Sequence, residues 1–156
     1  MVTPEQEAAS VMKYVLDKAG NPTPYYHNVP EGFIVPSVFF PRPEIEAGPD
    51  TLLSYGVDYQ WFIKFFAQTA GEAYETARRV LTAIEDGRRL IPLFNAAGEA
   101  TGERLRIRDP SVKAIDDQAT GLGTAQIHVS WKSRRPYDDQ SGILVQRFYL
   151  YYSQQA

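Results

Sequence analysis

The residues best suited to catalysis or metal binding are few in this sequence and far apart. There are two histidines, His27 and His128, and no cysteine. A serine triad would need an activated serine, yet no serine lies in a Gly-x-Ser-x-Gly turn. A zinc site would need closely spaced His or Cys ligands, and the two histidines are not spaced that way. We therefore expect no catalytic residue and no metal site, with both histidines as ordinary surface or packing residues.

Two acidic pairs and one glycine-rich stretch could bind ions or phosphate. Asp116–Asp117 and Asp138–Asp139 lack the ligand at every second position that a calcium loop needs, so solvated turns are the better interpretation. Gly121 and Gly123 precede a predicted strand instead of a helix, and no Lys-Ser or Lys-Thr follows them. These glycines therefore predict a hairpin loop, and we expect no cofactor.

Basic residues form the clearest polar pattern. Arg104, Arg106 and Arg108 alternate, which would put them on one face of a strand, and a second basic cluster spans 132–135. Such faces are typical of nucleic-acid binding, but they serve equally in ion pairs within or between subunits. The 156-residue chain has a formal net charge of −3, which favours ion pairing.

Aromatic residues are the remaining candidates for contact with a partner. Tyr149, Tyr151 and Tyr152 lie on a predicted final strand, and tyrosine is enriched at protein interfaces. They either form a subunit interface or close the core of the monomer. Phe39 and Phe40 lie in a proline-rich stretch, where they either pack on the core or contact a partner.

Two helices are expected to position these residues. Thr3 is a good N-cap for a helix that continues to Lys18 and stops at Gly20. A second helix should begin with a Thr69-x-x-Glu72 capping box and end at residue 86, with Gly87 as a left-handed stop. Each carries one apolar stripe, so both should pack on a sheet.

Most of the other segments have strand periodicity. The strongest alternation, at residues 55–66, predicts one buried face and one face that is polar at one end and aromatic at the other. Residues 90–94 and 104–108 should form a hairpin with a long loop. Further strands are expected at 112–115, 125–131 and 143–152.

Residues 22–50 hold seven of the 11 prolines, so they cannot be helical or form a central strand throughout. We expect a proline-rich arm or long loop, with one edge strand at 33–40 broken by Pro36. The whole chain, 1–156, then forms one α+β domain with an antiparallel or mixed sheet and two main helices on one face. The sequence contains neither a secretory signal pattern nor the ~20 apolar residues of a membrane span.

The order of these elements resembles the tail terminator proteins of long-tailed bacteriophages. The resemblance is carried by the strand from Tyr59 to Ala67, the helix from Ala73 to Asp86, and the strand from Ala125 to Lys132 with Tyr137 after it. It covers roughly residues 1–152 and concerns the order of elements. The proline-rich arm with Phe39 and Phe40 is longer and more apolar than the family pattern.

The resemblance implies a structural virion protein without enzymatic activity. Such subunits form a ring, a hexamer in this family, that caps the tail tube, ends its elongation and offers a surface for head–tail joining. The implied partners are further copies of the chain, the tail tube protein and a head–tail connector protein, with DNA passing non-specifically through the ring and no membrane. The implied location is the head-proximal end of the tail, after assembly in the host cytoplasm. A head–tail connector or other tail or tube component is the first alternative, and a small-ligand-binding enzyme domain is the second.

Overall fold

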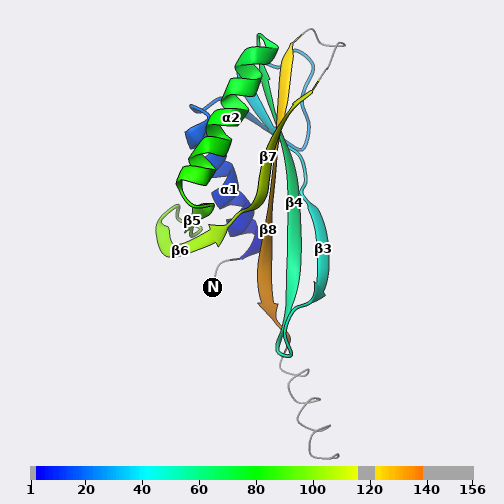
Figure 1. Ribbon diagram of the computed structural model, residues 1–156, viewed down its shortest axis with the longest axis vertical. Helices are drawn as coiled ribbons and strands as arrows, with labels where there is room; N and C mark the ends of the chain where they lie inside the picture. The colour runs from blue at the N-terminus through cyan, green and yellow to red at the C-terminus, as the bar shows by residue number, and fades with distance from the viewer. Residues whose placement is uncertain (1–2, 116–121, 139–156) are drawn as a thin grey trace, which may run out of the picture.

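A computed structural model describes residues 3–115 and 122–138 (Figure 1). The described chain contains two helices, a mixed six-stranded sheet and a small two-stranded sheet, which confirms the α+β class. The elements in chain order are α1 (Pro4–Lys18), β1 (Thr23–Tyr26), β2 (Ser37–Phe40), β3 (Glu44–Pro49), β4 (Ser54–Ala67), α2 (Ala70–Asp86), β5 (Leu90–Phe94), β6 (Ala100–Arg106), β7 (Arg108–Ile115) and β8 (Gly123–Pro136).

Two long antiparallel strands, β4 and β8, form the centre of the larger sheet. They pair along their whole lengths, from Ser54 opposite Pro136 to Ala67 opposite Gly123. The strand order is β1-β2-β4-β8-β7, and β3 pairs with the part of β4 that β2 leaves free. The strong alternation predicted for 55–66 thus belongs to a central strand, because both of its edges are hydrogen-bonded.

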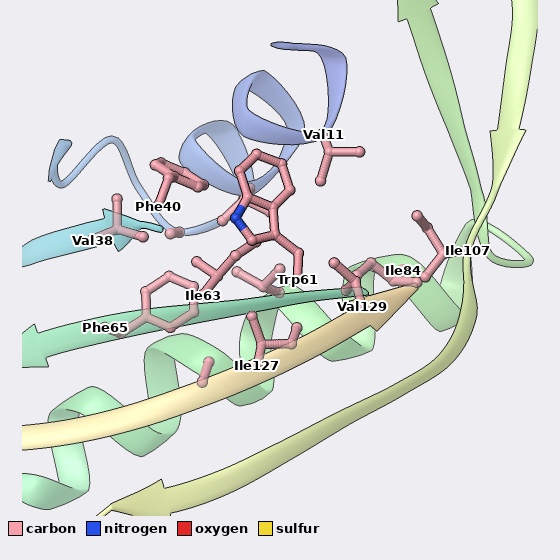
Figure 2. Packing of buried hydrophobic residues seen from close by; sticks show 14 of the residues in the cluster. Val11, Val38, Phe40, Trp61, Ile63, Phe65, Ile84, Ile107, Ile127 and Val129 are labelled. Atoms are coloured by element: carbon pink, nitrogen blue, oxygen red, sulfur yellow. The ribbon is translucent and has the colours of Figure 1, made fainter. Parts of the chain in front are cut away.

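Both helices lie on the same side of this sheet (Figure 1). α2 contacts β8, β7 and β4, while α1 contacts β5 and α2. The buried side chains of α2 recur at three- and four-residue steps, so one stripe faces the strands. Figure 2 shows the core that results, in which side chains of β4 and β8 gather with Val11 of α1 and Ile84 of α2.

The helix ends follow the predicted chemistry in part. Thr3 is the N-cap of α1, as predicted, and it forms a reciprocal capping box with Gln6. At α2, Thr69 Oγ1 accepts a hydrogen bond from the Glu72 amide at 3.2 Å, which is one of the two hydrogen bonds of the predicted capping box. The prediction of a left-handed Gly87 is wrong, because its φ is −82°. Arg88 and Arg89 have the positive φ angles instead, 58° and 61°. The chain therefore turns after the glycine, on its way into β5.

The proline-rich segment contributes three strands instead of forming a free arm. β1 pairs in parallel with β2, and β3 pairs with β4. The strand predicted at 33–40 begins at Ser37, after a cis peptide bond between Val35 and Pro36. It is not an edge strand, because β1 lies outside it. Prolines are accommodated here because β1 and β3 are short and peripheral.

One glycine permits the close approach of α2 to the sheet. A Cβ atom on Gly123 would lie 2.0 Å from the carbonyl oxygen of Thr69, the N-cap of α2. That neighbour is backbone, so it cannot move aside without displacing the helix start. Neither described helix has the length and apolarity that a membrane-spanning helix needs.

Candidate functional site

Phe39 and Phe40 are adjacent in β2, so their side chains lie on opposite faces of the sheet. Phe40 is buried in the core, stacked on Tyr26 and 5.7 Å from Trp61 between ring centroids. Core packing is therefore confirmed for Phe40. Phe39 is half-buried and pairs with Lys64 of β4, on the face away from the helices. Of the two, only Phe39 therefore remains a candidate for contact with a partner.

The three alternating arginines do not share a strand, so that prediction is wrong. Arg104 and Arg106 lie exposed on β6 of the small sheet, whereas Arg108 begins β7 of the large sheet. The buried residue Ile107 lies between them, and its amide donates a hydrogen bond to the Arg89 carbonyl at 2.7 Å. The arginines keep their alternate spacing while the chain passes from the small sheet to the large one, so the spacing alone could not reveal the change of sheet. Tyr149, Tyr151 and Tyr152 lie outside the described residues.

The sheet face away from the helices is half aromatic, as the alternation predicts. Phe62 and Phe66 are half-buried there, while Asp58 and Gln60 are exposed nearer the other end of β4. The Phe33 ring lies 5.1 Å from Phe66, so the loop before β2 partly covers this end.

His128 lies on the same face, 4.6 Å from Phe62 between ring centroids. Its Nε2 atom is buried and has no hydrogen-bond partner among residues 3–115 and 122–138. Within those residues, no group of three or more His, Cys, Asp or Glu side chains could hold a metal ion. The arrangement is therefore that of a packing surface, and we identify no set of catalytic groups in it.

A groove of about 550 Å³ runs between α1 and β5, and Tyr26 of β1 reaches its edge. Its apolar lining includes Met12, Leu16, Pro92 and Phe94. Lys13 lies on its rim, with Nζ 3.8 Å from the centre of the Phe94 ring. We call this feature the α1–β5 groove.

A second groove lies at the start of α2 and is lined mainly by polar and small residues, among them Glu72, Glu75 and Thr76. Its volume, about 580 Å³, is similar to that of the α1–β5 groove.

A buried carboxylate joins α1 to the sheet. Glu7 accepts hydrogen bonds from Ser133 Oγ at 2.8 Å and Trp131 Nε1 at 3.3 Å, and its Oε2 lies 3.9 Å from Arg135 Nη2. Burial raises the pKa of the neighbouring Tyr59 hydroxyl above its ordinary value, with Arg135 opposing this and Glu7 adding to it. The sequence offered no signal for these hydrogen bonds, because Glu7 lies over 120 residues from both Trp131 and Ser133.

The remaining basic residues of β8 are also paired, on a three-stranded extension of the sheet. We call this extension the ribbon; it comprises residues 44–49, 54–60 and 130–136, in which β3, β4 and β8 lie side by side. Asp50 accepts hydrogen bonds from Lys132 Nζ at 2.8 Å and Arg134 Nε at 2.5 Å. These contacts lower the pKa of the Asp50 carboxyl, and the hydrogen bond from Lys132 is the main cause. Ion pairing is thus confirmed for this basic cluster.

Gly56 makes room for the Lys132 side chain at this cluster. A Cβ atom on Gly56 would lie 2.2 Å from Lys132 Cε, so any larger residue would displace the lysine stem. A Cβ atom on Gly48, the partner of Gly56 on β3, would meet nothing within 4 Å. The two glycines therefore differ in function although they face each other across the ribbon.

Two curated proteins of Bacillus subtilis (strain 168) are similar to this chain. The protein YqbJ is 32% identical over 140 residues, which is 88% of this chain and 92% of the relative. The phage-like element PBSX protein XkdJ is 30% identical over 131 residues, which is 84% of this chain and 86% of the relative. No protein-family model matches the chain.

Proposed function

Because the chain belongs to the same protein family as XkdJ and YqbJ, we propose that it is a structural subunit of a phage tail, namely a tail terminator. The family tie to a protein of a phage-like element is the observation that carries the phage role. The tail-terminator assignment adds to it the order of elements, in which a long alternating strand leads into a helix that covers the sheet.

The proposed mechanism is geometric. Copies of the chain join through two different surfaces, and such contacts close into a ring when the rotation between neighbours is right. The ring matches the end of the tail tube on one side but does not seed another tube layer on the other, so elongation stops. The second side is then free for a head–tail connector protein, at the head-proximal end of a tail assembled in the host cytoplasm.

The charge of the chain agrees with a ring that DNA crosses. The formal net charge is −3, and the basic side chains at the ribbon are engaged with Asp50 and Glu7. Tight non-specific DNA binding requires free cations that displace counterions from phosphate. With these cations paired, the ribbon would not grip DNA that passes through the ring.

Mass measurement and tube assembly test the proposal. The purified chain should give one discrete oligomer by native mass spectrometry, and it should shorten the tubes formed by the tube protein of the same phage-like element in electron micrographs. A chain that stays monomeric at high concentration and leaves tube length unchanged would contradict the proposal. Long hollow filaments of the chain alone would assign it to the tube instead. A rise in melting temperature with a nucleotide or metal would favour a ligand-binding domain.

A further inference from the structure

The turn between β3 and β4 exposes three apolar side chains that lie close together. Seven large apolar side chains are exposed in the described residues, and Leu52 and Leu53 are the most exposed of them, at 75% and 68%. Tyr137 is also exposed and lies beside them, because its amide donates a hydrogen bond to the Leu53 carbonyl at 3.0 Å. We call this surface, residues 50–54 with Tyr137, the ribbon tip. Clustered exposed apolar side chains mark contact surfaces.

The ribbon tip is held in a defined shape by its own residues. The Thr51 amide donates to the Ser54 carbonyl at 2.9 Å, and the two hydroxyls lie 2.6 Å apart. The Tyr137 ring packs on the Tyr55 ring, with 5.6 Å between the centroids. The exposed leucines of the turn are therefore presented on a preformed surface, which lowers the entropy cost of packing another segment on them.

The chain leaves the sheet at this tip. β8 ends at Pro136 beside the turn (Figure 1), and Asp138 is the last residue that the structure describes. An extended residue spans at most about 3.6 Å, so Ile143 lies within roughly 18 Å of Asp138. A segment that begins at Ile143 is therefore close enough to contact the ribbon tip.

The sequence after Gly142 is unusually apolar. Eight of the ten residues 143–152 are apolar or aromatic, and the exceptions are Gln146 and Arg147. The run includes the tyrosines 149, 151 and 152, which the sequence predicts either at an interface or in the core. Such a run is expected to pack against protein instead of water. The ribbon tip is apolar surface within its reach.

The charges at the tip favour this segment. The three cations in residues 132–135 pair with only two carboxylates, those of Asp50 and Glu7, which leaves one positive charge in excess among these groups. The connection that leaves β8 contains the acidic residues 138–139 and has no cation before Arg147. Its charge therefore complements that of the tip.

We propose that residues 143–152 pack on the ribbon tip of their own chain and cover Leu52 and Leu53. A tether of a few residues gives a segment an effective concentration on the order of millimolar, and a segment from another copy lacks this advantage. The tether thus favours the chain's own segment as the occupant. The contact lies within each chain, so it does not depend on the ring of the proposed function.

Proteolysis tests whether the segment is covered. Chymotrypsin cuts after aromatic residues, and the rate of cleavage after Phe148 or Tyr149 depends on how often the segment leaves the tip. The double variant Leu52→Gln, Leu53→Gln should raise this rate at least roughly 10-fold, as expected when central apolar contacts are lost. Ile34→Gln is the matched control, because Ile34 is 61% exposed but lies in the loop before β2. The control should be cut at the wild-type rate, and all three proteins should give the same circular dichroism spectrum.

Three results of this assay would overturn the proposal. The first is equal cleavage of the wild type and the double variant, and the second is an equal acceleration by the control. The third is protection that appears only at concentrations at which copies associate, because the cover would then come from a neighbour. Protection that is independent of concentration supports a contact within the chain. A chain that shows this protection but never self-associates contradicts the ring alone, so the two failures are distinguishable.

Disulfide trapping tests the contact itself. The chain contains no cysteine, so the variant Leu53→Cys, Val145→Cys can form only the designed disulfide. Val145 is seven residues beyond Asp138 and reaches at most about 25 Å from it. The control is Ile34→Cys, Val145→Cys. β4 has 14 residues and is therefore about 43 Å long, and Phe33, the neighbour of Ile34, contacts the end of β4 that is far from the tip.

On mild oxidation, mass spectrometry should find a disulfide within the chain in the Leu53→Cys, Val145→Cys variant but not in the control. Failure to form this disulfide would overturn the proposal. So would a disulfide that forms faster between chains, in a mixture of the two single-cysteine proteins, than within one chain.

Discussion

Replacing Glu7 with alanine should destabilise the fold by about 3 kcal/mol, because it removes the acceptor that joins α1 to β8. The substitution leaves the Ser133 hydroxyl and the Trp131 indole without the carboxylate that binds them at 2.8 and 3.3 Å. Each buried donor left unpaired costs about 1–3 kcal/mol. Arg135 also loses its ion-pair partner at 3.9 Å, and because its Nη2 atom is buried, water cannot replace the carboxylate at that atom.

The expected loss corresponds to a fall in melting temperature of about 6–12 °C for a chain of this size. The variant Glu7→Gln keeps one acceptor oxygen and should lose about half as much free energy. Glu5→Ala is the matched control, because Glu5 lies exposed on the same first turn of α1 and interacts mainly with the helix dipole. It should cost less than about 1 kcal/mol.

Thermal and urea unfolding followed by far-ultraviolet circular dichroism measure these differences. A double-mutant cycle with Ser133→Ala should give a coupling energy of about 1 kcal/mol, since the two groups share a hydrogen bond. If Glu7→Ala unfolds within about 0.5 kcal/mol of the wild type, the network does not hold α1 on the sheet and the reasoning is refuted.

Three further outcomes follow from other parts of the molecule. Gly123→Ala should lower the free energy of unfolding by about 2 kcal/mol or more, because its Cβ would clash with backbone, whereas Gly48→Ala should be near neutral in the same urea titration. Asp50→Asn should lower stability at neutral pH but not in strong acid: the pKa of Asp50 is depressed in the fold, so its contribution exists above the ordinary aspartate pKa and disappears as pH falls through the folded value. Unfolding midpoints of both proteins across the acid range should therefore converge, and parallel curves would contradict this. Arg106→Glu should weaken the ring if β6 is interfacial, and an unchanged oligomer mass would remove Arg106 from the interface candidates.

The central elements were predictable because their patterns are long. β4 buries every second residue from Tyr59 to Ala67, while Tyr55 and Val57 of the same predicted face are half-buried, and α2 combines a threonine N-cap with a regular apolar stripe. In both, burial of one face dictates the pattern, and local periodicity is enough to detect it. The fold class followed from the order of these elements.

The peripheral elements and the polar clusters could not be predicted from local patterns. β1 and β3 are four and six residues long and contain prolines. A strand tolerates proline mainly at the edge of a sheet, and the sequence does not show which strands lie at an edge. The partners of Glu7 and Asp50 come from β8, more than 80 residues away. The arginine alternation continues from Arg106 to Arg108 although the chain changes sheets at Ile107, so the spacing gives no sign of that change.

The turn between β3 and β4 can take its final shape only after the end of β8 has been synthesised. The turn is formed by residues 50–54, but Lys132, Arg134 and Tyr137 hold it in place. A growing chain on the ribosome therefore lacks the finished turn until residue 137 has emerged. Pairing between segments so distant in the chain is slow to form, because the loop between them must first close. The turn is thus completed late in folding, although its own five residues are synthesised well before β8.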